Sequence, residues 1–502
     1  MYNDHKPYII DEFKGLWDRG DSENCPPEYW RDCNNVQFTG ANKFGTRDGI
    51  GISQTIAGPL GNIVRIYNYP QPTANGLIIL TYDGVNGKIY HWVNATTVYG
   101  PLLTIAGMTD FAFLPYDGRG YISPIATYTV NGLNVQKGIS GEFLYVYKGD
   151  GTAAFKAAGA APTGNVTVNN GAAGHTDAGT KVFGVVFEFD TGFLSAPAAL
   201  ASFSTNAALS VSFTNIPVSP SAHCIARHIV ASITIDNYDG NLEGYDLFFI
   251  PGADINDNTT TALANQSFYD ADLIDDATYL FDNYSEIPAG TCLCLYHNRL
   301  CLAGSYNDIS LIIVSAEGEP ESISQVDGLC IVPPDGNVIY NLQELRDVLY
   351  VMKRARTTSF IDNGDVPSSW KENGIDNALG CPIHGIGTVL DSGGNNVDYL
   401  LVATYQGLTI FNGRYILPEL SFNIDNLWKN LDQDDFSKIQ IVNSPIDKEI
   451  YIVTPDYILL VGNYANGLDP NNIRWSKWNA DVSINTVALV NINTLVFGSN
   501  NA

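Results

Sequence analysis

Positive charge is scarce in this sequence. Lysine and arginine contribute 26 residues against 53 aspartates and glutamates, which gives a formal net charge of −27 at neutral pH. The phosphate backbone of nucleic acid repels such a surface, so the composition argues against tight nucleic-acid binding by the isolated chain. The same repulsion suits the wall of a channel along which DNA slides without adhering, although acidity also serves solubility alone.

Long apolar runs are also lacking. The sequence has no stretch long and apolar enough for a transmembrane helix, so no membrane insertion is expected. Residues 1–17 lack the basic region and apolar stretch of a secretion signal, and we therefore expect assembly in a reducing cytoplasm. With 45% hydrophobic residues among 502, the chain can still bury a large core.

The eight cysteines form no C-x-x-C pair, so the common zinc spacing is missing. Cys292, Cys294 and the nearby Cys301 alternate with apolar residues, which is typical of small side chains packed within strands. A chain of this size does not depend on disulfides for stability. The sequence therefore predicts free, buried thiols.

Motifs of catalysis and metal binding are missing as well. The chain contains no H-E-x-x-H, no G-x-S-x-G and no phosphate-binding loop. His223 and His228 lie five residues apart, which places them on opposite faces of a strand. The segment DINDNT (254–259) begins like a calcium loop, but Thr259 stands where that loop needs glycine. We predict no catalytic residue, no cofactor and no metal, with a weak calcium site at 254–259 left open.

What the sequence has in abundance is short strands separated by glycine, asparagine and aspartate turns. Residues 76–93, 141–155 and 399–416 each show an apolar run, a turn and a second apolar run, the pattern of an antiparallel hairpin. The hairpins group at about 40 to 50 residues, the spacing of propeller blades. We predict an all-β protein built on a β-propeller of about six or seven blades.

The middle of the chain has a different pattern. Residues 161–276 contain well-separated strands such as Lys181–Phe189, and they follow a linker rich in alanine and glycine. This predicts an inserted β-sandwich of immunoglobulin or fibronectin type. The propeller would then be formed by residues 1–160 and 277–502 together. A single short helix is expected at Ile424–Leu431, at the surface or an interface, with Trp428 either in the core or anchoring a partner.

Several segments, read in order, carry short motifs that together resemble one family. They are NNVQFTGANKFGTRDGI (34–50, with Arg47 and Gly49), NIPVSPSAHCIARHIVAS (215–232, with Arg227), the segment 287–324 (with Asn298, Arg299, Gly304 and Ser305), and GLTIFNGRYILPELSFNIDNLW (407–428, with Gly407, Gly413 and Trp428). In this order they resemble the tail nozzle proteins of short-tailed bacteriophages, also called tail hub or stabilisation proteins. The likeness covers most of the chain.

The resemblance implies a non-enzymatic structural protein of the virion tail. Its copies would form a homo-oligomeric ring, expected to be a hexamer, below the portal and adaptor proteins. The ring would extend the tail channel for DNA ejection, contacting passing DNA without tight binding. Tail fibres or a tail needle are further candidate neighbours.

Physical roles can be assigned to the motif residues. Arg299 lies beside a hairpin turn, where a guanidinium can bridge loops through several hydrogen bonds. Gly304, Gly407 and Gly413 are expected to provide turns with positive φ. The chain stops soon after a strand at 495–498, so the strand near Val36–Phe38 is a candidate to complete the last blade.

Two other classes of function fit the same composition. The 28 tyrosines and 7 tryptophans could stack on sugars in a receptor-binding or glycan-binding tail protein, which would adhere to host cells alone. A propeller glycosidase needs two close carboxylates. Acidic clusters occur at Asp254/Asp257 and along 270–283, but solvated turns explain them as well. Turnover of host polysaccharide that one carboxylate substitution abolishes would identify the enzyme.

Overall fold

The computed structural model describes residues 13–19, 25–40, 43–47, 62–71, 76–94, 96–275, 286–391, 398–479, 483–490 and 494–499. Gly49 lies outside these ranges. Over the described chain the structure is almost entirely antiparallel β, as the turn-rich sequence predicts. No helix in this part of the chain is long and apolar enough to cross a membrane.

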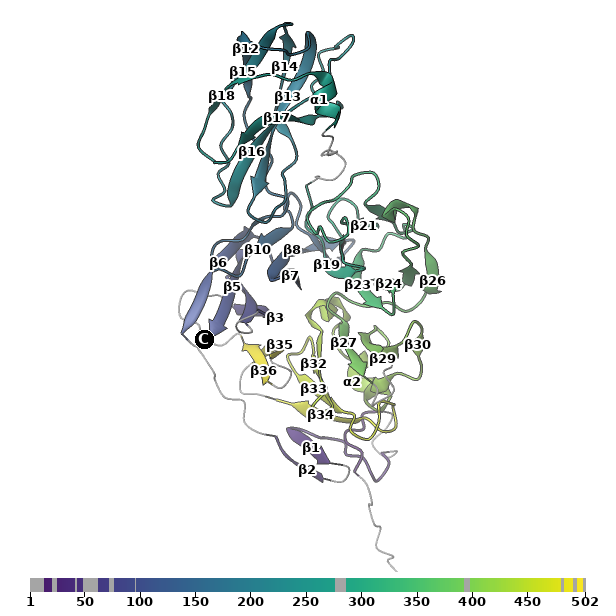
Figure 1. Cartoon of the computed structure of the whole chain (residues 1–502). Coiled ribbons are helices and arrows are strands. Elements are labelled where there is room, and N and C mark those ends of the chain that lie inside the picture. Colours follow the sequence, from purple (N-terminus) through teal and green to yellow (C-terminus); the bar gives the residue numbers. More distant parts are fainter. Residues whose placement is uncertain are drawn as a thin grey trace, which may run out of the picture.

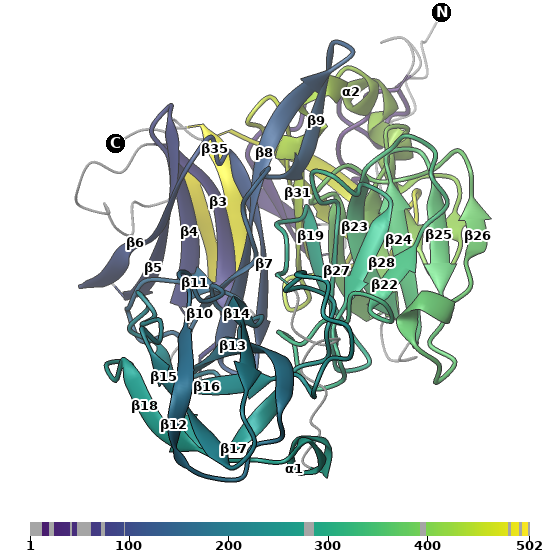
Figure 2. The same cartoon turned by 90° about the horizontal axis from the view of Figure 1, so that it is seen from above.

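Seven small sheets make up the larger body (Figures 1 and 2). Blade 1 contains β3 (Asn62–Tyr69), β4 (Gly76–Tyr82), β5 (Asn86–Asn94) and β6 (Thr97–Ala106). Blade 2 contains β7 (Asp110–Tyr116), β8 (Arg119–Val130), β10 (Tyr145–Tyr147) and β11 (Phe155–Lys156), with β9 (Leu133–Gly138) paired to the end of β8. Blade 3 contains β19 (Cys292–Tyr296), β20 (Arg299–Ala303), β21 (Leu311–Val314) and β22 (Leu329–Ile331).

The remaining blades follow in chain order. Blade 4 contains β23 (Ile339–Leu345), β24 (Val348–Lys353), β25 (Thr357–Phe360) and β26 (Asn373–Asp376), with a 3₁₀ turn, η2, at Pro367–Ser369. Blade 5 contains β27 (Ile386–Asp391), β28 (Asp398–Ala403), β29 (Leu408–Phe411) and β30 (Tyr415–Ile416). Blade 6 contains β31 (Gln440–Ser444), β32 (Glu449–Val453), β33 (Leu459–Asn463) and β34 (Arg474–Trp478). Blade 7, over the described residues, has β35 (Ile484–Val490) and β36 (Thr494–Ser499).

The first strand of every blade lines a common axial cavity, which makes the body a seven-bladed β-propeller. Apolar layers fill the spaces between neighbouring blades, for example Leu345 against Leu400 between blades 4 and 5, and Tyr451 near Val487 between blades 6 and 7. Blade 6 is covered on both faces, so its two central strands are buried along their whole length: all five residues of β32 and of β33 are buried. The expected propeller is confirmed.

The last blade is closed differently from the expectation. The segment before β1 (Val36–Gly40) follows the outer edge of blade 6: the Asn35 amide donates to the Lys477 carbonyl (2.7 Å), and the Trp478 indole donates to the Val36 carbonyl (3.0 Å). β1 pairs only with β2 (Lys43–Thr46), so it does not complete blade 7. Blade 7 instead packs directly on β3 of blade 1, with Ile66 and Ala488 in one apolar layer.

The insert is a two-sheet sandwich between blades 2 and 3, at one end of the molecule (Figure 1). One sheet has the order β12–β15–β18 and the other β14–β13–β16–β17, with Phe183, Phe187 and Phe213 among the core residues. In an immunoglobulin sandwich the first strand pairs with the second, whereas here β12 pairs with β15, so the strand order departs from that type. Its elements are β12 (Thr167–Ala173), β13 (Gly179–Phe189), β14 (Ala198–Thr205), β15 (Leu209–Thr214), β16 (Cys224–Ala231), β17 (Phe248–Ile255), β18 (Ala262–Gln266) and α1 (Asp270–Asp275).

The expected helix at 424–431 is shorter than its pattern and has one buried face. A 3₁₀ turn, η3 (Leu420–Ile424), leads into α2 (Asp425–Lys429), and a second 3₁₀ turn, η4 (Gln433–Lys438), precedes blade 6. Trp428 is fully buried, and its indole N–H donates to the Thr404 carbonyl (3.1 Å). The apolar face packs between blades 5 and 6 and places Trp428 in the core, whereas Lys429 is exposed, so the helix lies at the surface as expected.

Candidate functional site

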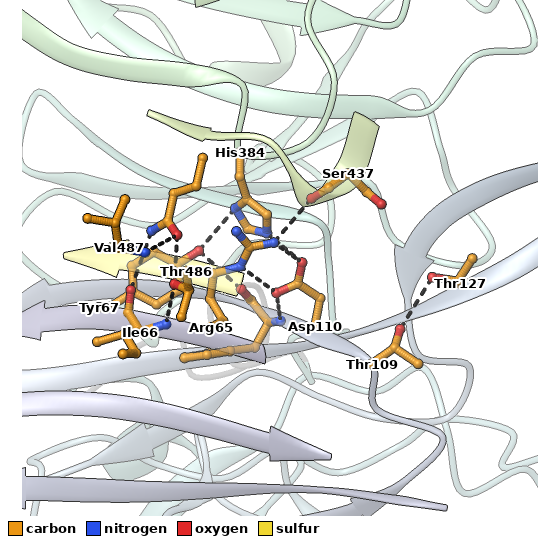
Figure 3. Close-up of polar contacts among 12 residues, drawn as sticks. Arg65, Ile66, Tyr67, Thr109, Asp110, Thr127, His384, Ser437, Thr486 and Val487 are labelled. Carbon is orange, nitrogen blue, oxygen red and sulfur yellow. Dashed lines mark hydrogen bonds and ion pairs between the residues drawn. The ribbon is translucent and has the colours of Figure 1, made fainter. Parts of the chain in front are cut away.

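A buried ion pair joins the first strands of blades 1 and 2 (Figure 3). Arg65 on β3 donates from Nε to Asp110 Oδ1 (3.1 Å) and from Nη2 to Asp110 Oδ2 (2.7 Å). Nη2 also donates to the carbonyl of Ser437, just before blade 6 (3.1 Å). Arg65 and Asp110 are 2% and 6% exposed. One guanidinium thus joins blades 1, 2 and 6.

His384, in the loop before β27, adds blade 5 to this network. Its Nε2 lies 3.0 Å from Asp110 Oδ2 and its Nδ1 lies 3.0 Å from the Tyr67 hydroxyl. The residue adopts φ of +58°, a left-handed conformation that is uncommon for any residue except glycine. A backbone held in this region usually serves a local constraint. Here it directs the imidazole to the axis.

The charge of Arg65 keeps Asp110 ionised and disfavours protonation of His384. Burial raises the pKa of Asp110, but Arg65 and His384 outweigh it and hold the pKa well below its usual value. Burial lowers the pKa of His384, and the Asp110 carboxylate opposes that shift only in part. A neutral imidazole in this position donates from Nε2 to Asp110 and accepts from Tyr67 at Nδ1. Both ring nitrogens are therefore engaged, so His384 is not available as a general base.

A second polar link lies beside the first, between the inner strands of blades 1, 6 and 7. The Ile66 amide donates to Thr486 Oγ1 (3.0 Å), and that hydroxyl donates to Gln440 Oε1 (2.7 Å). The Val487 amide donates to the same Gln440 oxygen (3.1 Å). Thr486 is fully buried, so these bonds form without competition from water. They fasten the last blade to the first.

The network divides the axial space into two cavities. One, of about 450 Å³, is lined by residues of all seven inner strands together with His384 and Tyr67. The other, of about 260 Å³, lies on the side of Arg65, Asp110 and Ser437. Among the described residues, Arg65 and Asp110 line the smaller space and Tyr67 and His384 the larger one, so this network lies between the two.

The sequence motifs lie far from this axis. Arg47 donates from Nε to Asn35 Oδ1 (2.9 Å) and from Nη2 to the Asn479 carbonyl (2.7 Å), beside the outer edge of blade 6. Arg227 is fully buried in the insert, where it donates to the carbonyls of Pro217, Asp257 and Thr260. Both arginines hold loops rather than face a cavity.

The blade 3 motif residues are structural too. Asn298 has φ of +59° in the β19–β20 turn and accepts a hydrogen bond from the Tyr116 hydroxyl of blade 2 (2.6 Å). Arg299 donates to the Ser315 carbonyl (3.2 Å), as expected of a loop-bridging arginine. Gly304 has φ of +75°, and Ser305 closes a turn with Asp308.

Different structural constraints account for the two glycines of blade 5, Gly407 and Gly413. Gly413 has φ of +103°, as expected. Gly407 does not have a positive φ; a Cβ there would lie 2.6 Å from Ser421 Oγ and 2.8 Å from Glu419 Cγ. Close packing against η3, rather than a left-handed turn, accounts for this glycine, which corrects the expectation.

Asp257 of the candidate calcium loop and His228 both make contacts within the insert. Asp257 accepts from the amides of Thr259 and Thr260 and from Arg227, which is a side-chain-closed turn. His228 lies between Asp254 and Glu188, at 2.7 and 2.9 Å. All eight cysteines are free and all except Cys25 are buried, as predicted.

A second buried acid lies where the propeller meets the insert. Glu321, in the loop after β21, is fully buried and accepts from the Ala158 amide (2.8 Å) and the Tyr121 hydroxyl (3.3 Å). Arg119 lies 3.8 Å away and donates to the Thr191 carbonyl of the insert (3.0 Å). Burial raises the pKa of Glu321 to about 7, despite these partners. Neither this residue nor Arg65, Asp110 or His384 is among the motif residues identified in the sequence.

Comparison with known proteins gives little. No protein-family profile and no curated protein matches the chain. Among solved structures, two of AztD from Citrobacter koseri, one of them the apo form, are 10% identical with TM-scores of 0.32 and 0.33, and each alignment covers 88% of this chain and 90% of the other. Hsv2 from Kluyveromyces lactis is 12% identical, with a TM-score of 0.29 and coverage of 84% and 98%. At these TM-scores the likeness carries no argument.

Proposed function

We propose that the protein is a structural, non-enzymatic subunit of a phage tail nozzle, in which several copies form a ring around the path of the DNA. The observation that carries the proposal is where the family-like motif residues lie. Arg47, Arg227, Arg299 and Trp428 each donate to backbone carbonyls in four separate parts of the molecule. Such residues maintain a scaffold, whereas an active site requires its groups to converge.

The size of the axial cavity bears on where DNA would pass in the proposed ring. The larger axial cavity holds about 450 Å³, a volume suited to a small molecule and far below that of duplex DNA. The Arg65–Asp110 pair lines the smaller cavity, of about 260 Å³. The DNA path of the proposed ring therefore runs between subunits, along their outer surfaces, and not through any propeller.

The insert has the charge that such a path requires. Between residues 161 and 276, thirteen aspartates and glutamates stand against two cations, Lys181 and Arg227. Both cations are fully buried. Apart from those paired with Lys148, Lys181 and Arg227, the carboxylates of the insert outnumber its cations and disfavour the approach of a phosphate backbone.

Ring assembly is the first expected result. The purified protein, alone or with the adjoining adaptor, should give ring particles in negative-stain images and a multiple of the chain mass by light scattering. The ring requires a heterologous interface, and the outer edge of blade 3 exposes Ile331 (71%) and Val326 (69%). Ile331→Glu should weaken assembly. Val85→Glu, at the exposed β4–β5 turn of blade 1, is the matched control and should leave it unchanged.

A monomer that remains a monomer with the adaptor present would contradict the nozzle proposal. If Ile331→Glu and Val85→Glu assemble equally well, the edge of blade 3 is not the ring interface.

Weak DNA binding is the second expected result. In a gel-shift titration with duplex DNA at physiological salt, we expect no retarded band at micromolar protein, because the chain carries a net charge of −27 and both cations of the insert are buried. A basic DNA-binding protein in the same gel serves as the positive control. Nanomolar affinity would refute the proposed channel wall.

A further inference from the structure

Two hairpin turns of neighbouring blades bring chemically useful side chains together. His297 and Asn298 connect β19 to β20 in blade 3, and Arg346 and Asp347 connect β23 to β24 in blade 4. All four residues have positive φ, between +46° and +59°. Two-residue turns of this kind require positive φ, which asparagine, aspartate and histidine adopt more readily than most other residues with a side chain. The two turns therefore hold the side chains of His297 and Asp347 at the ends of neighbouring blades.

The donor atoms of three residues converge. A ring nitrogen of His297, a carboxylate oxygen of Glu344 and one of Asp347 all lie within 4.8 Å of one another. Nε2 of His297 is 3.8 Å from Asp347 Oδ1. Glu344 is half-buried on β23, and Asp347 is 89% exposed at the turn. One nitrogen and two oxygens at this separation can contact a single metal ion.

The imidazole is held in position from its other side. Asp362 Oδ2 lies 3.5 Å from Nδ1 of His297, and the Asp362 side chain is only 11% exposed. The Gly364 amide donates to Asp362 Oδ1 (2.9 Å), and the Tyr296 ring stacks on the imidazole at 4.2 Å. Histidines that bind metals usually direct their second ring nitrogen to such a carboxylate. This contact leaves Nε2 directed toward Asp347.

The charges around His297 also call for a cation. Three carboxylates, those of Glu344, Asp347 and Asp362, surround one imidazole. Arg299 approaches Asp362 alone, at 3.9 Å. Carboxylates crowded in this way are stabilised by a bound divalent ion.

We propose that His297 Nε2, Glu344 and Asp347 bind a divalent transition metal such as Zn²⁺, with Asp362 positioning the imidazole. An imidazole ligand favours zinc-class metals over Ca²⁺ and Mg²⁺, which prefer oxygen alone. Three protein ligands leave at least one position for water or for a group from a partner. The ion would link the inner hairpins of blades 3 and 4, so it would stabilise the propeller.

The test uses the full-length protein after treatment with a chelator. Titration with ZnCl₂ in a calorimeter should show one equivalent bound, and the thermal midpoint should rise on binding. His297→Ala and Asp347→Asn should each abolish the site. Asp362→Asn should weaken binding about 10- to 100-fold, as loss of a positioning carboxylate does at other metal sites. Because Asp347 is almost fully exposed, its substitution leaves folding intact even if the His297 variant is unstable.

Two controls separate this site from other metal binding. His175→Ala, in the insert and remote from blade 3, should bind Zn²⁺ like the parent protein. Substitution of Co²⁺ should give visible bands without the intense near-ultraviolet absorption of a cobalt thiolate, since none of the proposed ligands is a cysteine. Zinc affinity unchanged in both the His297 and the Asp347 variants would overturn the proposal. Thiolate absorption, or a response to Ca²⁺ but not to Zn²⁺, would also overturn it.

Discussion

Substituting Asp110 with asparagine is expected to lower the free energy of unfolding by about 3–5 kcal/mol, the range for removing one partner of a buried ion pair. Arg65 would keep its charge at 2% exposure without a counter-charge. His384 Nε2 would lose its carboxylate acceptor. Because the pair joins blades 1 and 2 at the axis, where blade 5 also contacts it through His384, the loss affects the ring as a whole.

Urea unfolding, followed by tryptophan fluorescence and by circular dichroism, measures this change. Asp425→Asn removes the exposed i,i+4 partner of Lys429 and is the matched control, for which a much smaller change is expected. The double variant Arg65→Met with Asp110→Leu should recover part of the stability, since apolar replacement of a whole buried pair is often tolerated. A loss below about 1 kcal/mol for Asp110→Asn would show that the network contributes little.

The second large effect is on the dependence of stability on pH. Glu321 has a pKa of about 7 in the folded protein because burial disfavours its charge, against the ordinary value of 4.5 in the unfolded chain. The folded state therefore holds a proton that the unfolded state has released, so stability falls as the pH rises from 4.5 to 7. At about 1.4 kcal/mol per unit, this group alone removes about 3 kcal/mol over that range.

Glu321→Gln isolates this contribution. The variant keeps an acceptor for the Ala158 amide but does not titrate, so the difference in unfolding free energy between it and the parent should change by about 3 kcal/mol between pH 4.5 and 7. Below pH 4.5 the difference should be constant. Glu319→Gln, a nearby acid in the same loop, should show no such trend. Parallel curves for the parent and Glu321→Gln would refute the assignment.

Local features of the sequence predicted most of the fold. Turn residues recur between apolar runs, and a hairpin depends on residues that are close in sequence, so the blades and the sandwich were both expected. The ordering of strands within the insert depends on pairings such as that of β12 with β15, across two intervening strands, and no local pattern encodes it. The position of β1 beside blade 6 is equally non-local.

The contacts among Arg65, Asp110 and His384 could not be predicted from the sequence, because they too are non-local. Arg65 and His384 both bind Asp110, yet they come from strands and loops of different blades that meet only when the ring is complete. One signal was present: an arginine at the centre of the apolar strand NIVRIYNY (62–69) requires a buried partner. Its partner could not be chosen among 53 acids. Gly407 shows the same limit, since its neighbour Ser421 belongs to η3.

The contact between the first and last blades affects how the chain folds during synthesis. The amide of Ile66 and the hydroxyl of Thr486 are 420 residues apart in sequence. At typical elongation speeds the ribosome takes on the order of 20 to 80 s to travel that distance. During this time the apolar side of blade 1, with Ile66, Leu77 and Ile79, lacks its contacts with blade 7. Such a nascent chain is a natural client for chaperones, and it becomes protected only when its final strands emerge.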